Sequence, residues 1–169
     1  MRRLFALVLM ALPASLAAQN PAASAPPPQP AYSADSAAVV AVIAKLFDGM
    51  RARDTAAMHG QFHEAAVLRS ASMRQGQNVI EADGIGDWLN GVAGAPAGLL
   101  LDERLGPPDV RIDGNLAGVW VYYEFYAGDR FSHCGVDAFH LGRAADGWKI
   151  IAVSDSRRRQ GCAQSLGKK

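Results

Sequence analysis

The stretch from Leu116 to Arg157 constrains the fold more than any other part of the chain. It is rich in Val, Ile, Tyr, Phe and Trp, which favour β-strands, and turn-forming pairs interrupt it twice. These pairs are Gly128-Asp129 and Asp146-Gly147, and each can close a hairpin. The stretch therefore predicts a three-stranded antiparallel meander, around which the rest of the domain is arranged.

The residues before the meander predict three helices and further strands. Apolar residues recur between 39 and 50 at the spacing of one helical face, and a second helix follows that carries His59 and His63. A third helix, capped by Asp83, places Trp88 inside. Gly106-Pro107-Pro108 then bends a long strand, because two prolines cannot serve a central ladder. This order predicts an α+β fold, a cone-shaped barrel whose curved antiparallel sheet of about six strands wraps around three N-terminal helices.

The N-terminus has the pattern of a targeting segment. Arg2 and Arg3 precede an apolar run, and Ser15-Leu16-Ala17 fits a cleavage site. The run is too short for stable membrane insertion. We therefore expect a periplasmic or secreted protein. The predicted divisions are a signal peptide (1–18), a Pro/Ala-rich linker (19–33), the domain (34–158) and a C-terminal tail (159–169).

Charge and metal-ligand spacing exclude some classes of function. Seventeen Lys and Arg residues against sixteen Asp and Glu leave no field that would attract nucleic acid. His59 and His63 are four residues apart, so they can ligate a metal or form a solvated helix face. The pair lacks the neighbouring Glu of the zincin pattern and has no third ligand nearby, which favours the solvated face. We predict no metal and no cofactor.

The expected strand pairing divides the meander into two faces. A two-residue loop at Gly128-Asp129 places Glu124 opposite His133 and Trp120 opposite Asp137. Because strand side chains alternate, one face mixes aromatic residues, acids and a histidine, as ligand sites do, while the other is aliphatic, as subunit contacts are. The first face, predicted to be concave, carries Trp120, Tyr122, Glu124, His133, Asp137 and Phe139, and the second carries Val119, Val121, Val136 and Val153.

Glu124, His133 and Asp137 form the main chemical cluster of the predicted concave face. A neighbouring carboxylate raises the pKa of a histidine, and desolvation among aromatic rings raises the pKa of a carboxyl group. Such an acid can take a proton from a carbon beside a carbonyl. Asp137 and His133 are therefore the candidate catalytic residues if the chain is an enzyme. The favoured alternative is a polar network that binds a ligand or holds the first helix against the sheet.

These features together resemble the nuclear transport factor 2-like (SnoaL-like) superfamily, and within it the lumazine-binding-like branch of exported bacterial proteins. The resemblance covers roughly residues 35–158, and it implies a cone-shaped, often dimeric barrel with a pocket but no single activity. In enzymes of the superfamily a concave-face acid works with a Tyr or a second acid, roles that Asp137 and Tyr122 would take. The resemblance is carried by the element order, the Trp88 helix, the proline-bent strand, Gly-Trp-Lys-Ile at 147–150, FSHCGVDAF at 131–139 and DSRR at 155–158.

The two cysteines fit an exported protein, because an oxidising compartment favours disulfides. Cys134 begins the second meander strand, and Cys162 follows the last strand beside Gly161, which allows the tail to fold back. A Cys134–Cys162 disulfide would stabilise the fold by about 3 kcal/mol. The alternative is a buried thiol and a separate thiol in the tail. Catalysis by Cys134 with His133 is disfavoured, because adjacent strand residues point to opposite faces.

The sequence favours a binding protein over an enzyme. We expect a homodimer formed through the convex sheet face, with a small hydrophobic or aromatic molecule held in each cone. The alternatives are an isomerase- or cyclase-type enzyme that uses Asp137 and His133 for proton transfer, and a structural domain with a filled cone. The expected ligand-binding residues are Trp88, Trp120, Tyr122, Glu124, His133, Asp137 and Phe139.

Overall fold

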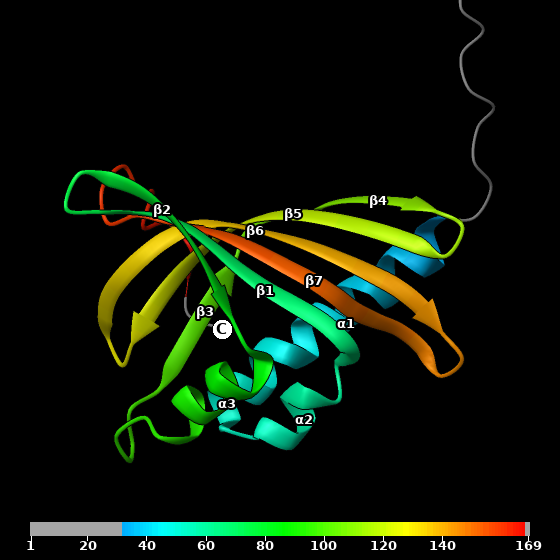
Figure 1. Cartoon of the computed structure of the whole chain (residues 1–169), viewed down its shortest axis with the longest axis horizontal. Helices are drawn as coiled ribbons and strands as arrows, with labels where there is room; N and C mark the ends of the chain where they lie inside the picture. The colour runs from blue at the N-terminus through cyan, green and yellow to red at the C-terminus, as the bar shows by residue number, and fades with distance from the viewer. Residues whose placement is uncertain (1–31, 168–169) are drawn as a thin grey trace, which may run out of the picture.

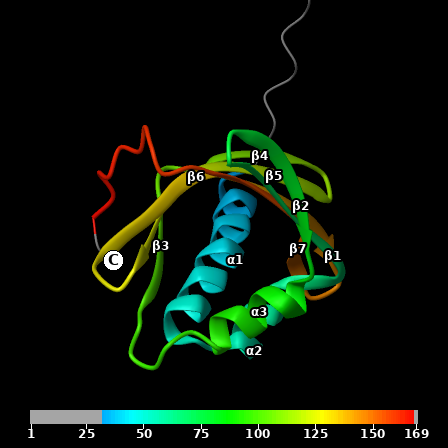
Figure 2. The ribbon, with the colours of Figure 1, turned by 60° about the vertical axis from the view of Figure 1, so that its left-hand side comes forward.

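The computed structural model describes residues 32–167. One strongly curved sheet holds three helices on its concave side, which confirms the α+β prediction (Figure 1; Figure 2). The sheet is not closed into a barrel, and it has seven strands where about six were predicted. The helices are α1 (Tyr32–Ala52), α2 (Thr55–His59) and α3 (Ile85–Ala93), and the strands are β1 (Phe62–Arg74), β2 (Gln77–Asp83), β3 (Leu101–Leu105), β4 (Asp109–Asp113), β5 (Leu116–Ala127), β6 (Arg130–Ala144) and β7 (Gly147–Arg157).

The sheet has the strand order β2-β1-β7-β6-β5-β3, and β4 also pairs with β5. All pairs are antiparallel except β1 with β7. Strands β3 and β4 pair with successive halves of β5, and Gly106-Pro107-Pro108 lies between them. The predicted bend in a long strand at the two prolines is therefore confirmed, since proline has no N–H for the ladder.

The core lies between α1 and the concave face of the meander, and Figure 2 shows α1 inside the hollow of the sheet. The helix contributes the apolar stripe that the sequence predicted, and the Phe47 ring meets the Phe139 ring edge-on at 6.2 Å between centroids. Burial of such side chains is the main force that holds a helix in a sheet. The buried core includes Leu46, Phe47, Met58, Phe62, Phe139, Leu141, Trp148 and Ile150.

Three details of the helices differ from the predictions. Helix α2 ends at His59 and His63 lies on β1, so the two histidines share no helix face. Among the described residues there is no group of three side chains that could hold a metal. The N-cap of α3 is Gly84 rather than Asp83. Helix α1 begins at Tyr32, inside the stretch predicted as linker, and the predicted signal peptide lies outside the described residues.

A β-bulge changes the pairing of β5 with β6. The loop at Gly128-Asp129 has two residues, as predicted, but Phe125 pairs with His133 and Tyr126 with Phe131, so Ser132 is left over. Every residue of β6 after the bulge is therefore shifted by one position against β5. Glu124 lies opposite Cys134, and the predicted pairing of Glu124 with His133 is wrong.

This one-residue shift exchanges the faces of β5 relative to β6, because side chains alternate along a strand. The valines predicted on the outer face belong to the interior instead: Val119 and Val121 lie in the core, and Val153 packs against it. Val153 changes face because a second irregularity interrupts the pairing of β6 with β7 between His140 and Leu141. Only Val136 of that predicted set remains on the convex face, opposite Tyr122.

The disulfide between Cys134 and Cys162 is present, with 5.8 Å between the Cα atoms. It closes a loop with a sequence separation of 28 residues, for which chain entropy gives about 3 to 4 kcal/mol of stabilisation. Arg158 also pairs with Cys134 through two backbone hydrogen bonds of 2.9 Å. The chain after β7 is thus tied to β6 twice. None of the described helices has the length and apolarity needed to cross a membrane.

Candidate functional site

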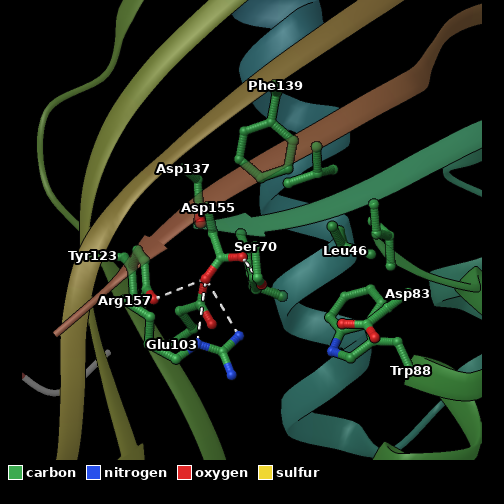
Figure 3. Close-up of a pocket in the computed structure, with 13 residues that line it drawn as sticks. Leu46, Ser70, Asp83, Trp88, Glu103, Tyr123, Asp137, Phe139, Asp155 and Arg157 are labelled. Carbon is green, nitrogen blue, oxygen red and sulfur yellow. Dashed lines mark hydrogen bonds and ion pairs between the residues drawn. The ribbon is translucent and has the colours of Figure 1, made fainter. Parts of the chain in front are cut away.

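A cavity of about 90 Å³ remains between α1, α3 and the concave sheet. Its walls separate into an apolar part and a polar part (Figure 3). This separation is typical of a site that takes an apolar body with a polar end. The apolar part consists of Leu46, Phe47, Leu68, Trp88, Phe139 and Val153, the polar part consists of Ser70, Glu103, Tyr123, Asp137, Asp155 and Arg157, and Asp83 lies apart from the polar group, beside Trp88 (Figure 3).

Asp155 is the centre of the hydrogen bonds in the polar part. The Ser70 hydroxyl donates to Oδ1 of Asp155, while the Tyr123 hydroxyl and Nε of Arg157 donate to Oδ2 at 3.4 and 3.3 Å. Tyr123 is also 3.1 Å from the Ser156 carbonyl oxygen. A carboxylate with three donors is well satisfied, so Asp155 orders the residues around it.

Glu103 and Asp137 form a pair of carboxyl groups in direct interaction beside Asp155. Burial raises the pKa of Glu103 to about 7, and burial together with the charge of Glu103 raises the pKa of Asp137 well above its usual range. Oδ2 of Asp137 has no donor among the described residues. Two ionised carboxylates are both acceptors, so they can bond to each other only when one holds a proton. The pair therefore keeps a proton near neutral pH.

Tyr123 stays protonated, because burial and the surrounding carboxylates raise its pKa. Its ring passes over Gly135, the residue opposite it on β6. A Cβ at position 135 would lie 2.8 Å from the ring and 1.7 Å from the Ser156 carbonyl oxygen. Gly135 thus permits the close approach that brings the Tyr123 hydroxyl to Asp155.

His133 lies on the concave side but not in the cavity; it lines a neighbouring groove. Its ring is packed against Phe125 and Tyr123, with centroids 5.1 and 5.7 Å apart. Burial and the positive charge of Arg157 lower the pKa of His133 to about 4, so the ring is neutral. The predicted rise of this pKa is wrong, since no carboxylate lies opposite the ring. Tyr123 and Gly135 lie between His133 and Asp137 in the strand register.

The structure places the other predicted site residues on both faces. Trp88, Asp137 and Phe139 line the cavity, as predicted. Trp120 is 61% exposed on the convex face, and Tyr122 lies on that face as well. Their predicted positions in the pocket are wrong because of the bulge at Ser132.

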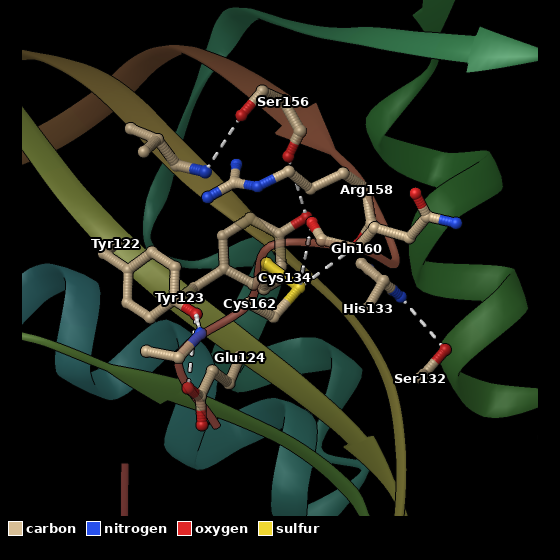
Figure 4. Close-up of a disulfide and its surroundings, with 12 residues drawn as sticks. Tyr122, Tyr123, Glu124, Ser132, His133, Cys134, Ser156, Arg158, Gln160 and Cys162 are labelled. Atoms are coloured by element: carbon tan, nitrogen blue, oxygen red, sulfur yellow. Dashed lines mark hydrogen bonds between the residues drawn. A yellow bond between two sulfur atoms is a disulfide. The ribbon is translucent and has the colours of Figure 1, made fainter. Parts of the chain in front are cut away.

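Glu124 is fully buried on the convex face, where it holds the C-terminal tail (Figure 4). Its carboxylate accepts hydrogen bonds from the backbone N–H groups of Ser165 and Leu166 at 2.9 and 3.2 Å. The hydroxyls of Tyr122 and Tyr126 donate to it at 3.2 Å each. The tail is therefore docked past Cys162.

Sequence reasoning missed Glu103, Tyr123, Asp155 and Arg157 as pocket residues. Glu103 stands between Asp102 and Arg104, and all three are charged, so the sequence does not indicate which side chain faces the cavity. In the structure Asp102 and Arg104 are buried as well, on the opposite face of β3. The predicted register puts Val121 and Val153 on the outer face, and by alternation Tyr123 and Asp155 would lie there as well. Gly135 was the one usable signal, because a glycine inside a strand marks a close approach of another group.

The curved sheet, the enclosed helix and the cavity can now be compared with known proteins. Residues 34–154 match the model of a family described as "Putative lumazine-binding". The chain belongs to this family. A comparison with curated proteins gives no match.

Solved structures similar to this member of the lumazine-binding-like family are nuclear transport factor 2-like (NTF2-like). An NTF2-like protein of unknown function from Shewanella baltica has a TM-score of 0.61 at 15% identity, covering 76% of this chain and 98% of that one. A cystatin-like-fold protein of unknown function from Nostoc punctiforme has a TM-score of 0.60 at 10% identity, covering 76% of this chain and 94% of that one. A "putative dehydratase from the NTF2-like family" of Streptomyces avermitilis has a TM-score of 0.57 at 18% identity, covering 74% of this chain and 96% of that one. At these identities the likeness shows the fold.

Proposed function

We propose that the protein is exported and binds a small amphipathic molecule in the cone, with the polar end of the ligand at the carboxyl pair. One observation carries this proposal: the carboxyl groups of Glu103 and Asp137 lie at the polar end of a cavity whose other wall is apolar, and burial raises the pKa of each. The Cys134–Cys162 disulfide supports export, because such bonds persist in oxidising compartments. No cofactor is required for this function.

The carboxyl pair lowers the stability of the fold, so its presence favours a role in ligand binding. An acid buried beside a second acid stabilises a fold less than an apolar side chain of similar volume would. A protonated carboxyl next to an ionised one offers one donor and several acceptors at one place. This combination suits a ligand edge that carries an N–H group beside a C=O group. Aromatic walls at Trp88 and Phe139 suit a flat ring behind that edge.

Lumazine has the required chemistry, which accords with the name of the family. It is a bicyclic pteridine dione, with ring N–H groups adjacent to carbonyls. The cavity takes only part of such a ring system, so we expect the polar edge at the carboxyl pair and the remainder toward Asp83 and Trp88 on the other side of the cavity (Figure 3). This geometry gives a direct test.

Lumazine should bind the wild-type protein in isothermal titration calorimetry at pH 7, and 1,3-dimethyllumazine, which lacks the N–H donors, should bind at least roughly tenfold more weakly. The Asp137→Leu variant keeps the branched shape of the side chain but replaces its two oxygens by methyl groups, so it should lose a similar factor for lumazine. Asp113→Leu, the same change at the exposed end of β4, is the control and should leave the affinity unchanged. Equal affinity for both compounds, or no lumazine binding at millimolar concentration, would contradict the proposal.

The second candidate is an isomerase- or cyclase-type enzyme. It is favoured by the Glu103 pKa of about 7, suited to a general base, and by the protonated Tyr123 as a donor to a developing oxyanion. Glu103 and Tyr123 would then replace His133 beside Asp137. Uptake of deuterium from D₂O at the α-carbon of cyclohexanone, lost in Asp137→Leu, would support the enzyme. Binding without any exchange would support the binding protein.

We also propose a homodimer through the convex face of the sheet, now centred on Trp120. This side chain is 61% exposed on β5, with Gly118 two residues earlier on the same strand and Ala138 opposite it on β6. An exposed tryptophan beside small residues is typical of an interface centre.

The Trp120→Ser variant should weaken the dimer, because truncation of a central tryptophan commonly costs about 2 kcal/mol, or roughly thirtyfold in the dissociation constant. Sedimentation equilibrium measures this constant. Ile80→Ser removes a side chain that is 80% exposed on the edge strand β2, and it should leave association unchanged. A wild-type protein that stays monomeric at high micromolar concentration would contradict the proposed dimer.

A further inference from the structure

A second hollow adjoins the cone at the end of the sheet where the β1–β2 hairpin, the start of β6 and the end of β7 meet. It is an open groove with a volume of about 700 Å³. Four arginines line it, Arg74, Arg157, Arg158 and Arg159, against a single acid, Glu81. The chain as a whole is almost neutral, so this local excess of positive charge is not a property of the general surface.

The charges in the groove are only partly neutralised. Arg74 is 2.6 Å from Glu81, and Arg157 is 3.3 Å from Asp155 in the cone. His133 also lines the groove, where burial and then the charges of Arg157 and Arg159 lower its pKa, while Asp155 raises it. Four arginines and a neutral imidazole together make the groove attractive to an anion.

The groove and the cone are continuous. Ser70 and Arg157 line both. The two hollows therefore adjoin at these residues, where Asp155 accepts hydrogen bonds from both side chains. A ligand that occupies the cone and the groove together would lie beside Ser70, Asp155 and Arg157.

The wall that carries the arginines is held in place. Arg158 is bonded to Cys134 through its backbone, and the disulfide to Cys162 fixes the chain four residues later (Figure 4). Docking of the tail on Glu124 adds a further anchor. A binding surface that is ordered before the ligand arrives loses less entropy on binding.

We propose that this groove is the anion subsite of the same binding site, and that it takes the phosphate of a phosphate monoester whose ring lies in the cone. The part of this proposal that concerns the ring rests on the proposed function; the phosphate site stands on the groove alone. Guanidinium groups grip phosphate through two parallel hydrogen bonds, and several arginines match a dianion better than a monoanionic carboxylate. Arg157 would contact both parts of the ligand.

The test compares phenyl phosphate with inorganic phosphate by calorimetry at low ionic strength. Phenyl phosphate should bind more tightly, because its ring reaches the cone, and affinity for both should fall as salt is added. Arg159→Gln should weaken both by roughly tenfold, which is the worth of one charge-assisted hydrogen bond. The matched control is Arg111→Gln at the other end of the sheet, on β4, which should change neither affinity.

Glu81→Gln provides a variant with the opposite expected sign. It releases Arg74 from its ion pair and removes the only acid of the groove, so phosphate should bind more tightly. An exposed ion pair contributes little to stability, so the variant should fold normally. Weaker binding in Arg159→Gln and tighter binding in Glu81→Gln, with no change in the equally charged Arg111→Gln, is a result that unspecific attraction to the net charge of the protein does not produce.

Three outcomes would overturn the proposal. One is phosphate affinity that is equal in wild type and Arg159→Gln, and another is an equal loss in Arg111→Gln. The third is cosedimentation with phosphatidylglycerol vesicles that millimolar phenyl phosphate does not displace, which would make the groove a lipid-headgroup site. Lumazine binding that depends on Asp137, with no phosphate binding, would leave the proposed function standing and remove the subsite alone.

Discussion

The Glu103→Gln variant should be more stable than the wild-type protein at pH 8, by about 3 kcal/mol in the free energy of unfolding. Burial raises the pKa of Glu103 from 4.5 to about 7, so the folded state holds a proton that the unfolded state releases at lower pH. Stability from this group is complete below pH 4.5 and is lost as the pH rises to about 7. Glutamine has no proton to lose, so the variant keeps that stability at pH 8.

Urea denaturation at several pH values measures this effect, and the difference between variant and wild type reports Glu103 together with its influence on Asp137. His133 acts in the opposite direction, because its pKa is lowered to about 4 and its neutral form adds stability as the pH rises toward 6.5. That contribution is common to both proteins and cancels in the difference. Asp137 acts in the same direction as Glu103. The two proteins should therefore agree near pH 4.5 and separate progressively up to pH 8.

The matched control is Glu64→Gln, an exposed glutamate on β1, which should give no pH-dependent difference. A Glu103→Gln variant that is less stable than wild type at pH 8 would mean that ionised Glu103 is needed by the fold. The acid pair would then be a structural network and not a site kept for a ligand. This outcome would count against both the binding and the enzyme proposals.

The sequence was sufficient for the architecture because the architecture depends on patterns that extend over many residues. The apolar stripe of α1, the prolines between β3 and β4 and the turn pair at Gly128-Asp129 all indicated what was found. The disulfide could also be predicted from the sequence, since Gly161 lets the tail return to Cys134. The prediction of these features stays correct even when the position of a helix or strand is wrong by one residue.

The site was harder to predict from the sequence, because it depends on strand register. An error of one residue in the register moves a side chain to the other face of the sheet. The bulge at Ser132 has no side-chain signature, yet it moved Glu124 away from the pocket and brought Tyr123 into it. Asp137 and Phe139 were placed correctly because both lie on β6 and keep their spacing whatever β5 does. The carboxyl partner of Asp137 proved to be Glu103 from β3, a strand that the predicted pairing never brought near it.

The Gly135→Ala variant should be severely destabilised, by about 3 kcal/mol or more. Alanine normally stabilises a strand relative to glycine by about 0.5 to 1 kcal/mol, so the expected sign is opposite to the general rule. The reason is space: the added Cβ would lie 1.7 Å from the Ser156 carbonyl oxygen, which belongs to the backbone of β7 and cannot rotate away. Strands β6 and β7 would have to separate where Arg158 and Cys134 hold them together.

Gly142→Ala on the same strand is the control, because the nearest atom to its added Cβ is the flexible Ile151 side chain at 3.4 Å. It should change the free energy of unfolding, measured in urea, by less than about 1 kcal/mol. Gly135→Ala should also weaken ligand binding in whatever fraction folds, since the methyl group displaces the Tyr123 ring and its hydroxyl from Asp155. Near-normal stability of Gly135→Ala would show that the close approach of Tyr123 to β6 does not hold in solution. The ordered polar end of the cavity, on which the proposed ligand site depends, would then lose its support.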